Sequence, residues 1–284
     1  MKQPMQFKDK FVDLSEPKVM GILNVTPDSF SDGGNYNQLD TALRQVEHMI
    51  EEGASFIDIG GESTRPGAQA VSAEQELTRV IPVIEAISSR FDTVISVDTN
   101  KAVVMHEAVS AGAGLLNDVC ALQAEGALVA AATAGVPVCL MHMQGEPRTM
   151  QQAPQYENVL ADVYNFLKQR VTQCIQAGIK QHNIIIDPGF GFGKTLVHNY
   201  QLLANLRQFL TLDVALLVGM SRKSMIGALL DRNVEERLAG SIGAAMLAAQ
   251  QGAHIIRVHD VKETVDALKV LKMMNAYKDD NSER

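Results

Sequence analysis

The side chains best suited to chemistry in this sequence are polar groups at the ends of apolar runs of strand length. Asn24 lies near the end of VMGILNV, Asp98 ends VISVD, Asn117 and Asp118 end LLND, and Asp187 ends NIIID. Carboxylate and amide oxygens placed in this way can accept N–H groups from a ligand. Each has a structural alternative, because Asp98 could cap the next helix and Asn117-Asp118 could be a hydrogen-bonded turn.

The stretch that begins at Asp187, DPGFGFGK, favours a binding role over a structural one. Pro188 disfavours a simple helix cap, and alternating Gly and Phe let backbone and rings approach a ligand closely. Nucleotide-binding loops are excluded, since the P-loop spacing requires Gly at Pro188 and the dinucleotide-binding spacing requires Gly at Lys194.

Cationic side chains follow the last two apolar runs. In LLVGMSRKS, two hydroxyl groups, Arg222 and Lys223 converge where a predicted helix begins at Ser224, an arrangement that favours an anion. Arg257 and His259 are two residues apart, so a strand would point both to one face, where they could bind the same anion. The alternatives are an exposed basic turn and structural partners for acidic residues.

Apolar runs of strand length alternate with amphipathic helical stretches along the chain, which is the pattern of parallel βα units. Strands are predicted at 19–25, 55–60, 93–98, 114–119, 136–142, 183–187, 214–219 and 254–259. Helices are predicted at 38–52, 73–91, 102–111, 124–134, 155–177, 196–210, 224–251 and 261–276. About eight such units close a TIM (β/α)8 barrel, in which the carboxyl ends of the strands form the active-site mouth. The competing architecture, an open doubly wound sheet, needs a glycine-rich turn after its first strand, and that turn is absent. We expect one α/β domain over residues 1–284, with residues 278–284 as a disordered tail.

Composition and charge narrow the class of protein. A net charge of −8 and a pI near 5.4 argue against a nucleic-acid binder, which needs a surplus of Lys and Arg. The N-terminal stretch is charged throughout, unlike a signal peptide, and the uncharged runs are too short to span a bilayer. Three widely spaced cysteines fit a reducing compartment. We therefore expect a cytoplasmic protein with no membrane and no nucleic-acid partner.

The polar tips of the strands suit a flat heterocycle. Asp98, Asp187 and Asn117, with Lys223 beside them, would face a ring that displays adjacent N–H groups and a carbonyl. A carboxylate can accept two parallel N–H bonds from a 2-amino-pyrimidinone, as it does from Arg, and a pterin contains this group.

The remaining tips suit a diphosphate. Arg257 and His259 could bind its oxygens, and Asn24 could offer an oxygen to a Mg²⁺ that bridges the phosphates. The residues therefore predict a pterin substrate whose leaving group is pyrophosphate.

Eight segments between about residues 15 and 275 occur in a fixed order: VMGILNVTPDSFSDGG, DIGGESTRPGA, SVDTNK, NDV, LMHMQGEP, DPGFGFGK, LLVGMSRKSMIG and IIRVHDVKET. In sequence and order they resemble the motifs of the bacterial dihydropteroate synthases. The resemblance implies a TIM barrel, usually a homodimer. It also implies that the barrel joins 4-aminobenzoate to a 7,8-dihydropterin methyl diphosphate and releases pyrophosphate in folate biosynthesis.

Matching positions carry the family's roles onto this chain. The resemblance assigns the pterin to Asp98, Asn117, Asp187 and Lys223, and the diphosphate and Mg²⁺ to Asn24, Thr64, Arg257 and His259. It makes the Phe30/Asp32 loop and the Thr64-Arg65-Pro66 loop mobile walls of the site. The residues implied to frame the aminobenzoate, where sulfonamides would also bind, are Pro66, Phe192, Lys223 and Ser224. Those implied to be catalytic are Asp32, Arg65, Lys223, Arg257 and His259.

The expected reaction is a substitution at the pterin methylene in which the C–O bond breaks well ahead of attack by the amine. Asp32 would face the cationic methylene. Two alternatives stay open. A pterin-binding methyltransferase acting on a corrinoid would have no use for the Arg257/His259 pair, and a non-catalytic pterin binder would not need Asn24, Arg65 and Lys223.

Overall fold

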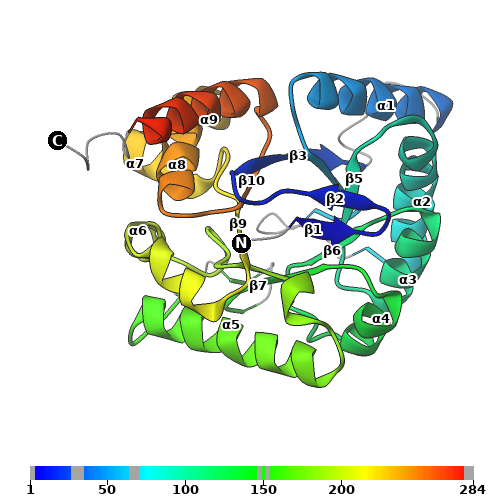
Figure 1. Cartoon of the computed structure of the whole chain (residues 1–284), viewed down its shortest axis with the longest axis horizontal. Coiled ribbons are helices and arrows are strands. Elements are labelled where there is room, and N and C mark those ends of the chain that lie inside the picture. The colour runs from blue at the N-terminus through cyan, green and yellow to red at the C-terminus, as the bar shows by residue number, and fades with distance from the viewer. Residues whose placement is uncertain (1–3, 27–34, 64–70, 146–148, 151–153, 278–284) are drawn as a thin grey trace.

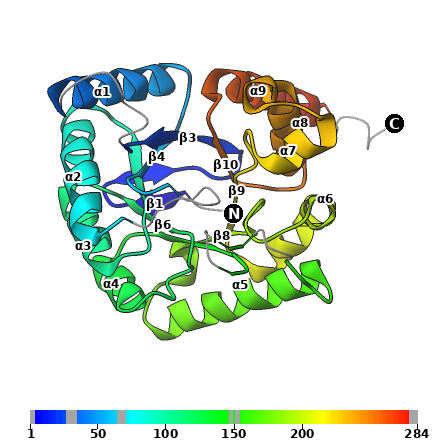
Figure 2. The same cartoon turned by 180° about the vertical axis from the view of Figure 1, so that it is seen from behind.

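Eight parallel strands close into a barrel in the computed structural model, which describes residues 4–26, 35–63, 71–145, 149–150 and 154–277 (Figures 1 and 2). Each strand pairs with the next along the chain, and the last pairs with the first. The barrel strands are β3 (Lys18–Asn24), β4 (Phe56–Gly60), β5 (Val94–Asp98), β6 (Leu115–Asp118), β7 (Val138–Met141), β8 (Ile184–Asp187), β9 (Ala215–Val218) and β10 (Ile255–Val258). The TIM barrel and all eight strands expected from the sequence are confirmed.

Helices surround the strands as an outer ring (Figure 1). They are α1 (Asn35–Glu51), α2 (Ala73–Arg90), α3 (Ala102–Ala111), α4 (Ala127–Ala134), α5 (Val159–Gln176), α6 (Leu196–Ala204), α7 (Ser224–Leu230), α8 (Leu238–Gln250) and α9 (Val261–Ala276). Their apolar faces pack on the barrel; in α2, for example, Val80, Ile84 and Ile87 are buried, and Ser72 and Gln75 form a capping box.

The single helix expected at 224–251 is wrong. The chain leaves α7 at Asp231, which adopts a left-handed conformation, and passes through a short 3-10 turn before α8 begins. Gly227 and Gly240 allow the two helices to pack closely, since a Cβ at Gly227 would lie 2.2 Å from the Arg237 guanidinium.

An antiparallel hairpin that the sequence analysis did not predict precedes the barrel. It consists of β1 (Met5–Phe7) and β2 (Lys10–Val12) and lies across one end of the barrel (Figure 1). Phe7 packs edge-on against Phe56 with ring centroids 5.0 Å apart. The hairpin thereby covers an apolar cluster that fills the lower barrel interior: Met5, Phe7, Leu14, Met20, Phe56, Val94, Leu115, Cys139, Ile185, Ala215, Leu217 and Ile255.

Candidate active site

The register of the strands places polar side chains in one layer near the carboxyl ends. Asn24 pairs with Gly60, Gly60 with Asp98, and Asp98 with Asn117. Gly60 leaves room in this layer, because a Cβ at that position would lie 3.8 Å from both Asn24 Oδ1 and Asp98 Cβ. Asn24, Asp98 and Asn117 therefore lie at one level of the barrel, on β3, β5 and β6, with Gly60 of β4 between the first two. Asp98 does not cap α3, whose N-cap position is occupied by Lys101.

Asp58 is a site residue that the sequence analysis missed. It lies in the middle of β4 with no exposed surface. Its carboxylate accepts hydrogen bonds from Ser96 Oγ at 2.5 Å, from Asn117 Nδ2 at 3.2 Å and from Arg257 Nε at 2.6 Å. A charge inside the apolar run FIDIG, two residues before Gly60, was the signal that could have identified it.

Asn117 and Asp118 could each have faced the site or formed a hydrogen-bonded turn, and the structure gives one role to each residue. Asn117 faces the barrel interior and binds Asp58, whereas Asp118 accepts the backbone N–H groups of Cys120 and Leu122, both at 2.7 Å. Asp118 is therefore the turn residue.

Arg257, on β10, reaches two carboxylates of the barrel interior. Its Nε donates to Asp58, and its Nη2 donates to Asp98 Oδ2 at 3.1 Å. The guanidinium thus bridges two carboxylates, with the Arg257 side chain 20% exposed and that of Asp98 10% exposed. This contact brings together residues that lie 159 positions apart in the sequence.

The buried charges shift one another's pKa values. Burial and the charge of Asp58 raise the pKa of Asp98 to about 7, although Arg257 opposes the shift. Burial also raises the pKa of Asp187, against the effect of Lys223. Burial lowers the pKa of Lys223 to about 8, and the negative charge of Asp187 limits the fall. A ligand that binds here can therefore replace or share a proton held by these side chains.

Lys223 and the loop after β8 form the opposite wall of the site. Lys223 Nζ donates to the Phe190 carbonyl at 2.5 Å and lies 4.4 Å from the centroid of the Phe192 ring. Asp187 is buried and accepts the Gly189 N–H at 2.7 Å. The loop thus holds Phe192 and Lys223 together, as expected for two residues that share a ligand.

The four residues Ser221 to Ser224 do not all converge on one anion. Arg222 turns away to form an ion pair with Asp260, with Nε 3.0 Å from Oδ2. Ser221 Oγ lies 3.0 Å from Nδ1 of His259, which is exposed. The predicted convergence of two cations is therefore wrong, because Arg222 is engaged elsewhere, and Lys223 is the cation of this segment that faces the site. Ser224 is exposed at the start of α7.

Five predicted site residues lie outside the described part of the chain: Phe30, Asp32, Thr64, Arg65 and Pro66. The residues on either side of 64–70 are described and held firmly. Glu62 Oε1 accepts the Val71 N–H at 3.2 Å, and Lys101 forms ion pairs with Glu62 and with buried Glu76. Arg79 Nη1 donates to the Gly61 carbonyl at 2.8 Å.

The described residues contain no group of three or more His, Cys, Asp or Glu side chains that could hold a metal ion. Asn24, half-buried at the end of β3, offers one amide oxygen beside Gly60. A divalent ion at this place would need further oxygen ligands from a substrate.

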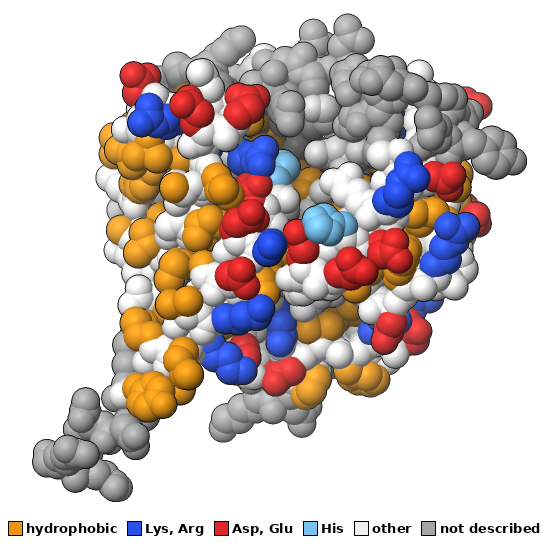
Figure 3. All heavy atoms as spheres, turned by 90° about the horizontal axis from the view of Figure 1, so that it is seen from above, with side chains coloured by type: hydrophobic (Ala, Val, Ile, Leu, Met, Phe, Trp, Pro, Cys, Tyr) orange, Lys and Arg blue, Asp and Glu red, His pale blue; other side chains and the backbone are white. Residues whose placement is uncertain are grey.

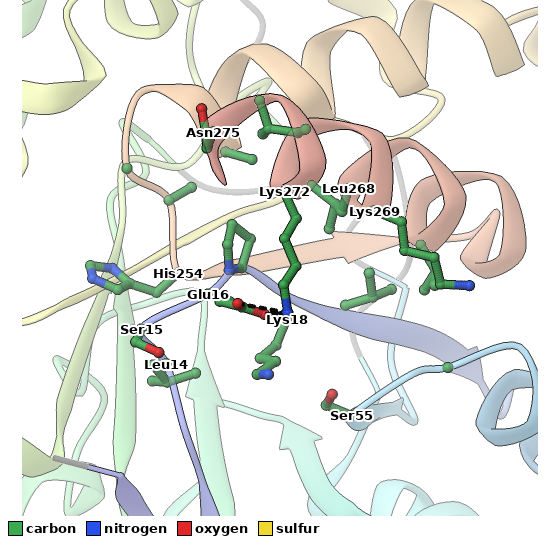
Figure 4. Close-up of a pocket in the computed structure, with 18 of the residues that line it drawn as sticks. Leu14, Ser15, Glu16, Lys18, Ser55, His254, Leu268, Lys269, Lys272 and Asn275 are labelled. Carbon is green, nitrogen blue, oxygen red and sulfur yellow. Dashed lines mark hydrogen bonds and ion pairs between the residues drawn. The ribbon is translucent and has the colours of Figure 1, made fainter. Parts of the chain in front are cut away.

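A cavity of about 660 Å³ lies at the opposite, amino-terminal end of the strands (Figure 4). Lys18, Ser55 and His254 line it beside α9, and Lys272 crosses it to pair with Glu16 (Figure 4). It contains none of the predicted site residues. In TIM barrels this end serves stability rather than chemistry.

Within the described residues, no helix combines the length and the apolar character required to cross a bilayer. Acidic and basic side chains are interspersed on the face shown in Figure 3, and apolar side chains gather along one side of it.

A closed parallel barrel with buried carboxylates, an Arg and a Lys at the carboxyl ends of its strands defines a TIM-barrel enzyme. Residues 20–259 match the family described as pterin binding enzyme. The dihydropteroate synthase of Escherichia coli K12 is 59% identical over 261 residues, which are 92% of this chain and 93% of that protein.

Solved structures show the same likeness. A dihydropteroate synthase of Yersinia pestis in a sulfonamide drug complex is 54% identical, with a TM-score of 0.92, and the match covers 96% of this chain and 100% of that one. The Xanthomonas albilineans enzyme with 4-aminobenzoic acid is 50% identical with a TM-score of 0.92, covering 97% and 99%. The chain belongs to the dihydropteroate synthase family and is therefore a transferase.

Proposed function

We propose that the carboxyl-terminal mouth of this barrel condenses 4-aminobenzoate with (7,8-dihydropterin-6-yl)methyl diphosphate, giving 7,8-dihydropteroate and pyrophosphate for folate biosynthesis. One observation carries the proposal: Arg257 bridges Asp58 and Asp98 in the layer that also holds Asn117, with Lys223 and Asp187 close enough to shift each other's pKa. The relatives with a sulfonamide drug or 4-aminobenzoic acid bound support the choice of substrates.

The pterin is proposed to lie against Asp98, Asn117, Asp187 and Lys223. Its 2-amino group and adjacent ring N–H would donate to a carboxylate as a fork, and Lys223 would donate to the ring carbonyl or a ring nitrogen. A carboxyl group with a pKa of about 7, as at Asp98, can share its proton with a ring nitrogen or lose it to accept N–H groups.

The diphosphate is proposed to lie toward Asn24, Thr64, Arg257 and His259. The Arg257 guanidinium donates to Asp58 through Nε and to Asp98 through Nη2. It could therefore keep one carboxylate and donate its other N–H groups to the departing diphosphate, whose negative charge it would stabilise. The C–O bond at the pterin methylene is proposed to break first and to release pyrophosphate, leaving a cationic carbon that Asp32 would face. The amine of 4-aminobenzoate then attacks that carbon and loses one proton to solvent. Arg65 is proposed to assist the same departure.

The 4-aminobenzoate is proposed to lie between Phe192 and Lys223 on one side and Phe30 and Pro66 on the other, with its carboxylate toward Ser224. The contact between Lys223 and the Phe192 ring supports this wall.

Mg²⁺ is the proposed cofactor. Asn24 would give it one oxygen and the diphosphate would supply others, since the part of the chain that the structure describes has no group of three or more His, Cys, Asp or Glu side chains that could hold a metal ion. When bound, the ion would neutralise charge on the leaving group. We also propose that residues 1–284 form one domain and that the enzyme works in the cytoplasm as a homodimer. Exposed Leu247, Val270 and Met273 on α8 and α9 support a partner surface.

The test is pyrophosphate release by purified protein. Release must require the dihydropterin diphosphate, 4-aminobenzoate and Mg²⁺ together; release without the amine, or none with all three, would contradict the proposal. Arg257→Ala should lower kcat by about 10²- to 10³-fold, the usual cost of one transition-state donor. Arg207→Ala is the matched control, since that guanidinium bonds to the Gln250 carbonyl at the surface. An unaltered rate in Arg257→Ala would count against the mechanism.

A further inference from the structure

Lys194 is a buried lysine that the proposed reaction does not use. Lys194 follows the loop after β8 and is 3% exposed. Four acceptors surround its Nζ: the carbonyls of Gly189 at 2.8 Å, Phe192 at 2.9 Å and His142 at 3.3 Å, and Nδ1 of His142 at 3.0 Å. The ammonium therefore lies where the β7–α5 loop and the β8–α6 loop meet.

The four acceptors around Nζ need N–H groups to bind, and this favours a charged Lys194 beside a neutral His142. An ammonium has three N–H groups for these four acceptors, whereas a neutral amine has two. Burial lowers the pKa of His142 to about 2, so its ring is neutral and Nδ1 can accept. Burial and the charge of Lys223 lower the pKa of Lys194, whereas the charge of Asp187 opposes the fall. The three carbonyl oxygens around Nζ favour the charged form, because they can accept all of its N–H groups.

The loop around Lys194 is folded so that its carbonyls turn inward. Gly189, Gly191 and Gly193 have φ of +69°, +80° and +61°, values that other residues rarely adopt. A Cβ at Gly189 would lie 1.9 Å from the His142 carbonyl oxygen. Inward carbonyls repel one another and are buried, so without a cation the loop would leave them unpaired.

This loop shapes the proposed active site directly. Phe190 contributes the carbonyl that Lys223 binds, and the Phe192 ring packs beside the Lys223 ammonium. A Cβ at Gly191 would lie 3.1 Å from Lys223 Cδ, so the loop backbone passes close beside the Lys223 side chain. The charge of Lys194 also opposes protonation of Asp187.

We propose that Lys194 is a positioning residue: its ammonium acts as a built-in cation that organises the loop of residues 189–193 and thereby fixes Lys223 for the pterin. It does not touch the substrate. Its place among carbonyl oxygens is the one that a bound monovalent cation would take. This inference rests on the proposed function for its kinetic part and on the loop geometry alone for its structural part.

The test is chemical rescue of Lys194→Ala. The substitution removes three carbons and the nitrogen, which n-propylammonium matches atom for atom. We expect kcat/KM for the dihydropterin diphosphate to fall about 10- to 100-fold, as for the loss of hydrogen bonds to a charged group. Hydrogen exchange in residues 189–194 should quicken while that in α3 stays unchanged. Millimolar n-propylammonium should restore both quantities saturably, whereas n-propanol and tetramethylammonium, which lack the charge or the N–H groups, should restore neither.

Lys168→Met on the outer face of α5 is the matched control and should change neither quantity. Restoration of Lys194→Ala by n-propanol as well as by n-propylammonium would show that Lys194 only fills space and would overturn the proposal. Wild-type kinetics and hydrogen exchange in Lys194→Met would overturn it as well. If Lys194→Ala does not fold, His142→Ala removes one acceptor and should still quicken exchange in 189–194; unchanged exchange would overturn the proposal. The exchange measurements need no activity, so their result stands even if the wild-type protein releases no pyrophosphate.

Discussion

Replacing Asp98 with Asn should stabilise the fold while weakening pterin binding. Asp98 and Asp58 share Arg257, and burial with the charge of Asp58 raises the pKa of Asp98 from 3.8 to about 7. Because the folded-state pKa lies above the unfolded one, the protonated carboxyl stabilises the fold below pH 3.8. That contribution is lost as the pH rises to 7. Asparagine keeps the neutral form at every pH.

The size of the effect follows from the shift. A difference of about 3 pKa units at ~1.4 kcal/mol each gives ~4 kcal/mol that the wild type loses between pH 4 and pH 8. The weaker hydrogen bond from Arg257 to an amide returns ~1 kcal/mol of this difference. Asp98→Asn should therefore be more stable than the wild type by ~3 kcal/mol at pH 9 and about equally stable at pH 4. For a chain of this size that is roughly 6–12 °C in thermal midpoint.

The measurement is thermal unfolding of both proteins at pH 4, 7 and 9, with pterin affinity from calorimetry at pH 7. Asp58→Asn provides the internal control, because removing its charge should lower the pKa of Asp98 and reduce the pH dependence of the Asp98 substitution. A midpoint difference that is the same at pH 4 and pH 9 would refute the reasoning, since Asp98 would then titrate alike in the folded and unfolded chains.

Four further substitutions, in two sets, test the framework of the barrel. Gly189→Ala and Gly135→Ala share a φ of +69°, but a Cβ would meet a carbonyl oxygen at 1.9 Å in the first and nothing within 4 Å in the second. Gly135→Ala should lower the free energy of unfolding by ~1–2 kcal/mol, and Gly189→Ala should lower it several times more. Urea unfolding measures both values, and equal losses would show that the loop at Gly189 does not pack closely on the loop at His142. Lys101→Met leaves buried Glu76 without its cation and should lower the free energy of unfolding by ~3–5 kcal/mol. Adding Glu76→Gln should recover most of this loss. A double variant as unstable as the single one would contradict the role of this ion pair.

The barrel could be predicted from the sequence because each of its units is specified locally. Runs such as VMGILNV and LLND predict strands that are buried on both faces, and small-residue stops such as Gly53-Ala54 and Gly112-Ala113 mark the end of the preceding helix before five of the strands. The same locality let Asn24, Asp98 and Asp187 be recognised at strand tips. Their lateral arrangement then followed from closing eight units in order.

The features that the sequence did not predict are those set by distant partners. Asp58 is held by Ser96, Asn117 and Arg257, which lie 38, 59 and 199 residues away. The charge inside FIDIG marks the residue as unusual, but the local sequence does not show which partners it binds. The break between α7 and α8 depends on a left-handed Asp231, a conformation that Asp adopts without a strong sequence signal. The β1–β2 hairpin has strands of three residues, too short to show a period.

Two of these features, the β1–β2 hairpin and Asp58, bear on the electrostatics of the site. The hairpin places Phe7 against Phe56 and covers the lower barrel, so the layer that holds Asp58 has an apolar floor beneath it. Asp58 has no exposed surface, and the side chain of Asp98 is only 10% exposed. In that setting two carboxylates that share Arg257 cannot both ionise at little cost, and the raised pKa of Asp98 follows.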